Sequence, residues 1–157
     1  MKVLGAESEE EVDSGEILDL IEQYEKENDV FVQIFDPSFV VGKEHLIWAH
    51  NKAETTFKNG TNRASDLGIE VLLWSSAEWQ IKDALKKMGV EGKIDEIALM
   101  TDGDGKRLLE FLDLEKNDDI LEMKKEKLRK FGIKNHEMES VDRPEDLIFE
   151  KMATSIL

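Results

Sequence analysis

The sequence predicts an α/β fold in which helices surround a central β-sheet, formed by residues 1–157 as a single domain. Stretches with the 3.6-residue period of amphipathic helices alternate with short apolar runs that are typical of buried strands. The length lies in the range of one domain, and a hydrophobic content of 40% suffices for a core without disulfides or metal. With two prolines and ten glycines, the chain contains no Pro- or Ser-rich linker that would divide it.

The first predicted elements are a helix and a strand. Residues 14–28 are expected to be helical, because their apolar residues recur at helical spacing and Ser14 can cap the first turn. The apolar run 30–35 predicts a buried strand, which Asp36-Pro37 ends.

The middle of the chain predicts a second helix over 43–58, with Gly60 as its C-terminal stop. Residues 69–75 form an apolar run that favours a central strand covered on both faces. Ser76 can then cap a helix over 77–88. The remaining elements are a strand over 96–101, helices over 105–112 and 123–131, and a last helix from Asp142-Arg143-Pro144 to the end of the chain.

Charge is distributed unevenly. The chain has 21 Lys and Arg against 36 Asp and Glu, so its net charge is −15, which excludes bulk attraction to nucleic acid as the main mode of binding. Residues 1–40 carry 2 basic and 12 acidic side chains, whereas residues 41–90 carry 7 and 6. An anion is therefore expected to dock in this neutral-to-basic middle segment; the other interpretation is that charge runs are only solvated faces.

Several kinds of chemistry are excluded or disfavoured. The absence of cysteine excludes disulfides, zinc fingers and thiol nucleophiles. Residues 102–106 resemble neither a phosphate loop, since Met100 and Arg107 replace its required residues, nor a complete calcium loop. His45 and His50 would point about 140° apart on a helix, so they would not chelate one metal. An autonomous enzyme is therefore disfavoured, and no cofactor, metal or small-molecule substrate is expected.

No membrane or export segment is expected either. Apolar runs reach five residues at most, whereas a spanning helix needs about 20. The N-terminus turns acidic at once, unlike a signal peptide. These features and the lack of cysteine favour a cytoplasmic protein.

Two tryptophans and the last helix stand out. Trp48 and Trp79 each lie off the apolar stripe of their predicted helix, so each either anchors an interface or packs beneath neighbouring residues. The last helix is apolar around well over half of its circumference, and such a helix is either sandwiched in the core or buries its second face on a partner.

Several motifs resemble the family of kinase-binding accessory subunits of the KEOPS complex, the PRPK-binding proteins. They are Lys43-x-His45-Leu46, Phe57-x-x-Gly60-x-Asn62-x-Ala64, Leu67-x-x-Glu70-Val71-Leu72-Leu73, Gln80-Ile81-x-x-Ala84-Leu85-x-x-x-Gly89 and Glu150-Lys151-Met152-Ala153. The family often has Gly-x-Arg before the Gln-Ile pair, whereas this chain has Glu78 and Trp79 in the place of that glycine and arginine. One positive charge is thus missing.

The resemblance implies an α/β domain with a mixed sheet, and an adaptor rather than a catalyst. KEOPS completes threonylcarbamoyladenosine in tRNA, and its accessory subunit docks on a small protein-kinase-like ATPase, stimulates the complex and helps to recruit tRNA through its 3′ CCA end. The charge of −15 predicts weak tRNA binding by the isolated subunit.

The last helix is the expected kinase dock. Ile148, Met152 and Ile156 share one face at i, i+4 and i+8, and Phe149 and Trp48 are expected to add contacts. Burying three such side chains would contribute roughly 1.5–3 kcal/mol each before the costs of association. Met152→Arg is then expected to leave the domain folded but to abolish co-purification with the kinase.

A small anion site is expected where helix ends meet in the middle segment. Its candidate residues are Lys43, His45, Asn62, Arg63, Trp79, Gln80 and Lys82. Phosphates of a single-stranded CCA end would contact the cations, and a base would stack on Trp79 or His45. The alternatives are a protein-interaction domain that keeps the kinase dock without RNA contact, and a small acyl- or nucleotide-processing enzyme, for which the sequence offers no convergent polar pocket.

Overall fold

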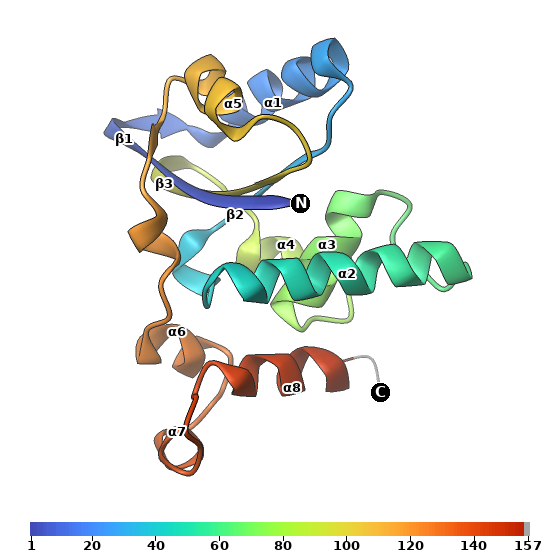
Figure 1. The fold of residues 1–157 in the computed structure, drawn as a ribbon, viewed down its shortest axis with the longest axis vertical. Helices are drawn as coiled ribbons and strands as arrows, with labels where there is room; N and C mark the ends of the chain where they lie inside the picture. Colours follow the sequence, from blue (N-terminus) through green and yellow to red (C-terminus); the bar gives the residue numbers. More distant parts are fainter. Residues whose placement is uncertain (156–157) are drawn as a thin grey trace.

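A computed structural model describes residues 1–155 and contains one four-stranded sheet with helices on both faces (Figure 1). The strands are β1 (Lys2–Asp13), β2 (Val32–Phe35), β3 (Lys93–Thr101) and β4 (Glu115–Lys116). They are ordered β2-β3-β1-β4, and each neighbouring pair is antiparallel. The predicted α/β class is confirmed, but the sheet is antiparallel and not the mixed sheet that the resemblance implied.

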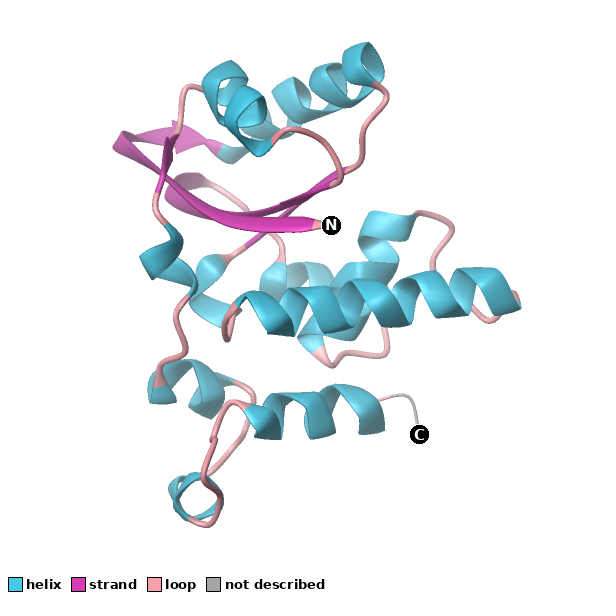
Figure 2. Cartoon of the chain, in the orientation of Figure 1, coloured by secondary structure: helices cyan, strands magenta, loops and turns pink. Residues whose placement is uncertain are grey.

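The helices form layers on either side of this sheet (Figures 1 and 2). They are α1 (Ser14–Asn28), α2 (Lys43–Asn59), α3 (Leu67–Ser76), α4 (Ile81–Met88), α5 (Gly105–Leu112), α6 (Lys125–Lys130), α7 (Asn135–Glu139) and α8 (Asp146–Thr154), with 3-10 turns η1 (Pro37–Phe39) and η2 (Asp118–Leu121). Helices α1 and α5 cover one face, α2 to α4 lie on the other, and α8 lies beyond α2 (Figure 1). None of the helices within residues 1–155 is long and apolar enough to cross a membrane.

The sheet separates two hydrophobic cores. Along β3, Ile97 and Leu99 point into the core under α1 and α5, whereas Ala98 and Met100 point into the core formed with α2, α3 and α8. This alternation follows from the two-residue period of a strand, and because both faces are covered, all four side chains are buried.

Strand β1 is the longest element that the sequence did not predict, and the short elements β4 and α7 were not predicted either. The acidic side chains Glu9, Glu10 and Glu11 obscure its apolar alternation, and they lie where the register against β3 is irregular, between Glu7 and Val12. Its start is constrained by packing, because a Cβ on Gly5 would come within 2.2 Å of the Asn117 carbonyl oxygen.

The prediction of a strand over 69–75 is wrong, because this run lies in helix α3. Its apolar residues face α2, β2 and α8 in turn, so the helix is buried nearly all round and lacks a polar face. Asp66 caps its start by accepting a hydrogen bond from the Ile69 amide at 3.0 Å. Because short apolar runs fit a buried strand or a buried helix equally well, periodicity alone did not distinguish them.

Two predicted caps also differ. Asp13, rather than Ser14, caps α1 by accepting hydrogen bonds from the amides of Gly15 and Glu16. Ser76 ends α3, and α4 begins only at Ile81, so the helix predicted over 77–88 is shorter. Gly60 ends α2 in the left-handed conformation, as predicted.

Candidate functional site

The apolar face of α8 is part of the core. Ile148 and Met152 are 0% exposed and contribute to the core beneath α2 and α3. The prediction that they form an accessible dock is therefore wrong. Of the two alternatives for a helix with two apolar sides, the structure shows that Ile148 and Met152 pack into the protein's own core. Met152→Arg would bury a charge and unfold the domain, contrary to the sequence-based expectation. Ile156 lies outside the described residues.

Two of the predicted kinase contacts keep part of their surface accessible. Trp48 on α2 and Phe149 on α8 are partly exposed, and their ring centroids lie 6.0 Å apart. Lys52, one turn after Trp48, lies 5.1 Å above the indole centroid. An apolar surface with a cationic edge thus joins the two helices.

His45 is a structural residue and not part of an RNA site. It is fully buried, its Nδ1 accepts a hydrogen bond from the Val41 amide at 3.0 Å, and its Nε2 donates to the Ser75 carbonyl oxygen at 2.8 Å. Burial lowers the pKa of His45 to about 4, so the ring is neutral and inaccessible to a ligand.

Lys43 is also separated from the other predicted RNA contacts. It begins α2, where its ammonium lies 2.8 Å from the carboxylate of Asp118, whereas Asn62 and Arg63 follow the far end of the helix. Seventeen residues of helix place the two ends about 25 Å apart. The prediction that these groups cluster is wrong for Lys43.

Arg63 and Trp79 do come together. The Arg63 guanidinium carbon lies 5.1 Å from the ring centroid of Trp79 and 5.3 Å from that of Trp74. Its Nη1 donates to the carbonyl oxygens of Glu78 and Trp79, at 3.1 and 3.4 Å. Among residues 1–155, the buried Arg63 Nη2 and Trp74 Nε1 have no acceptor. Trp79 is 56% exposed, so it offers a stacking surface that is fixed from below by a cation.

The loop that positions Arg63 is built on a buried carboxylate. Glu70 on α3 is 0% exposed and accepts hydrogen bonds from the amides of Arg63 and Ala64, both at 2.9 Å, and from the Thr56 hydroxyl at 3.0 Å. Asn62 donates its side-chain amide to the Ala64 carbonyl oxygen at 2.8 Å. Burial lowers the pKa of Arg63, and Glu70 opposes this shift. Asn62 and Arg63, the two predicted site residues in this loop, thus both form hydrogen bonds that fix its conformation.

Four of the predicted kinase and RNA contacts are linked to one another through the buried Trp74. Phe149 lies beside Trp48, whose ring centroid is 6.0 Å from that of Trp74, and Trp74 lies beneath Arg63. We call Phe149, Trp48, Trp74, Arg63 and Trp79 the aromatic row. It extends from the last helix to the loop before α4.

Helix α4 adds exposed groups next to the aromatic row. Gln80 and Lys82 are exposed, as the RNA prediction requires, and Lys86 follows Lys82 by one turn on the same face. The apolar side chains of Ile81 and Leu85 are 40% and 44% exposed. Ile81 and Leu85 form an exposed apolar strip that the sequence did not predict, because Ala84 and Met88 alone fill the space beneath the helix.

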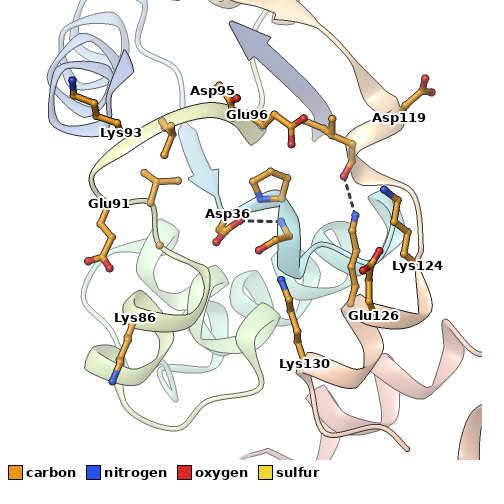
Figure 3. Close-up of a pocket in the computed structure, with 17 residues that line it drawn as sticks. Asp36, Lys86, Glu91, Lys93, Asp95, Glu96, Asp119, Lys124, Glu126 and Lys130 are labelled. Atoms are coloured by element: carbon orange, nitrogen blue, oxygen red, sulfur yellow. Dashed lines mark hydrogen bonds between the residues drawn. The ribbon is translucent and has the colours of Figure 1, made fainter. Parts of the chain in front are cut away.

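A polar cleft between α4, α6, η1, η2 and the start of β3 was not predicted (Figure 3). It encloses about 660 Å³ and is lined by both acidic and basic side chains, Asp36 and Lys130 among them. Because five lysines face six carboxylates, the cleft lacks a field that would attract an anion. Lys127 at its wall is buried and donates to three carbonyl oxygens, each at 2.8 Å, and burial lowers its pKa to about 8. This lysine joins η1 and η2 to α6.

No group of three or more His, Asp or Glu side chains within residues 1–155 is arranged to hold a metal ion. The aromatic row and helix α4 together present partly exposed rings, exposed apolar side chains and lysines. Such surfaces are typical of small α/β proteins that bind other macromolecules.

Comparison with known families agrees with this class. The family model described as kinase binding protein CGI-121 matches residues 12–155, and the chain belongs to this family. The kinase-binding family predicted from the sequence motifs is thereby confirmed, and a kinase is supported as partner. No curated protein matches the chain.

Proposed function

We propose that the chain is a non-catalytic accessory subunit of a KEOPS complex, which binds and stimulates the kinase-like ATPase and helps to recruit the 3′ CCA end of tRNA in the cytoplasm. Family membership supports the kinase partner. The tRNA contact is supported chiefly by the exposed indole of Trp79 stacked on Arg63.

The kinase is proposed to dock on the part of the aromatic row formed by Trp48 and Phe149. These rings are partly exposed, come from two adjacent helices and have Lys52 at their edge. Aromatic side chains that are half buried before binding lose little conformational entropy on association, which suits them as anchors. Ile148 and Met152 support this surface from below without contacting the partner.

Trp48→Ala and Phe149→Ala test this dock by co-purification with the kinase-like ATPase of the same host. Each is expected to weaken binding at least about tenfold, as loss of an aromatic anchor does, while thermal unfolding confirms the fold. The matched control is Ile81→Ala with Leu85→Ala, which removes the other exposed apolar strip. Normal binding by both aromatic variants, with loss in the control, would place the dock on α4 instead.

The 3′ end of tRNA is proposed to follow a path from Trp79 along α4. A base would stack on the indole, and the phosphates would contact Lys82 and Lys86, one turn apart. The Arg63 guanidinium carbon lies 5.1 Å from the centroid of this indole and supports the ring from below. This path retains Arg63, Trp79, Gln80 and Lys82 of the predicted site and omits Lys43 and His45.

Gel shifts with full-length and CCA-trimmed tRNA at low salt test the path. Trp79→Ala is expected to weaken binding of full-length tRNA roughly tenfold, whereas Trp79→Phe keeps a stacking ring and most of the affinity. Lys82→Ala is expected to weaken binding, and Arg107→Ala, an exposed cation on α5, serves as its control. Equal binding of both RNAs, or normal binding by Trp79→Ala, would overturn this path. Absence of binding to either RNA would favour the alternative of a protein-interaction domain without RNA contact.

A further inference from the structure

A second surface lies at the opposite end of α2 from the RNA path. A groove between the start of β1, the start of α2 and α5 encloses about 750 Å³. Its apolar lining consists of Met1, Val3, Leu4, Ile47, Leu109 and Leu114. Met1 and Ile47 are 42% and 36% exposed, so part of this lining faces solvent. None of the surfaces described above uses it.

The rim of the groove is basic, although the protein as a whole is strongly acidic. The lining contains four lysines, Lys2, Lys43, Lys106 and Lys116. Glu110 is the one acidic side chain of the lining. Asp118, behind the rim, lies 2.8 Å from the Lys43 ammonium and 3.6 Å from that of Lys116, and it fixes both lysines beside the groove. In a chain of net charge −15, this is a local reversal of sign around an apolar floor.

We propose that the groove binds an acidic amphipathic segment of a partner protein. Apolar side chains of the segment would cover Ile47 and Leu109, and its carboxylates would face the lysine rim. A nucleic acid fits less well, because the lining contains no aromatic ring on which a base could stack. A second copy of the chain is disfavoured, because two bodies of charge −15 repel each other.

The test uses the full chain and a fluorescein-labelled synthetic helix of about 14 residues, which presents leucines on one face and glutamates on the other. Fluorescence anisotropy is expected to show saturable binding with a Kd below about 100 μM that weakens with added salt. A matched peptide with glutamines in place of the glutamates keeps the apolar face without the charges and is expected to bind at least about tenfold more weakly.

Ile47→Asp places a charge on the apolar floor, and Lys106→Glu reverses a charge on the rim. Each is expected to weaken binding of the acidic peptide at least about tenfold, and both positions are exposed, so the fold is retained. Lys58→Glu, at the other end of α2, changes the charge by the same amount as Lys106→Glu and is its matched control. Because Ile47 and Lys106 do not belong to the aromatic row, both variants are expected to co-purify with the kinase normally. A failure of the groove proposal is thereby distinguished from a failure of the kinase dock.

Three results would overturn this assignment. They are the absence of saturable binding by the wild-type chain, equal binding of the glutamine peptide, and unchanged binding by both Ile47→Asp and Lys106→Glu. Sedimentation equilibrium of the wild-type chain tests whether a second copy of the chain occupies the groove. A dimer that Ile47→Asp dissociates would assign the groove to self-association and not to an acidic partner.

Discussion

His45 shows how burial fixes the role of a single residue. Its ring joins the chain before α2 to the end of α3, with Nδ1 facing the Val41 amide and Nε2 facing the Ser75 carbonyl oxygen. A second ring proton would point at the amide hydrogen of Val41. Burial, which disfavours the charged ring, lowers the pKa of His45 to about 4, although the Ser75 carbonyl favours the charged form.

This shift predicts a pH-dependent stability. The unfolded chain takes up a proton on His45 near pH 6.5, whereas the folded chain does so only near pH 4. Stability is thus retained above about pH 6.5 and is lost as the pH falls towards 4, by about 3 kcal/mol in total. Urea unfolding at several pH values should show this slope in wild type and in His136→Asn, which changes an exposed histidine. His45→Gln should unfold at lower urea but with a flatter pH dependence; an unchanged slope would contradict the assignment.

At the scale of elements, α3 supports the candidate RNA loop through one side chain. Glu70 offers one carboxylate oxygen to two amides, those of Arg63 and Ala64, and the other oxygen to the Thr56 hydroxyl. A carboxylate meets this requirement because it only accepts hydrogen bonds. The loop would otherwise leave buried amides without partners, at a cost of about 1–3 kcal/mol each.

Glu70→Gln tests this role. The amide group of glutamine would face either the hydroxyl or a backbone donor, so we expect a loss of about 1–3 kcal/mol in the free energy of unfolding. Because the loop carries Arg63, tRNA binding should fall as well. Glu139→Gln, an exposed carboxylate on α7, should change neither property. Unfolding at the wild-type urea concentration would show that the loop does not depend on this carboxylate.

The same elements show how far sequence reasoning reaches. Amphipathic periods predicted α1, α2 and α5 closely, because each of these helices has one buried face. The run 69–75 was misjudged because a short apolar run fits a buried strand and a buried helix equally well, and the last helix was misjudged for another reason. A pattern specifies which residues are apolar, but not whether the chain's own core or a partner covers them. For the site, Arg63 and Trp79 were both predicted to belong to one anion site at helix ends, and the structure brings them together. The burial of His45 and Met152 depended on long-range packing.

At the scale of the whole molecule, the net negative charge opposes the binding of anions at the lysine-bearing sites. The RNA path and the groove carry lysines, but the chain bears a net charge of −15, and Glu9, Glu10 and Glu11 project from the irregular part of β1. Charges of this kind repel RNA over distances set by ionic strength, with a Debye length of about 30 Å at 0.01 M salt and 10 Å at 0.1 M.

The triple variant Glu9→Gln, Glu10→Gln, Glu11→Gln separates this field from direct contacts. It should strengthen tRNA binding several-fold at about 0.01 M salt and leave it unchanged at about 0.3 M, because screening removes the long-range repulsion but not stacking on Trp79. Gel shifts over a salt series measure both limits, and Trp79→Ala should weaken binding at every salt concentration. A triple variant that strengthens binding equally at high salt would place these glutamates in direct contact with the RNA.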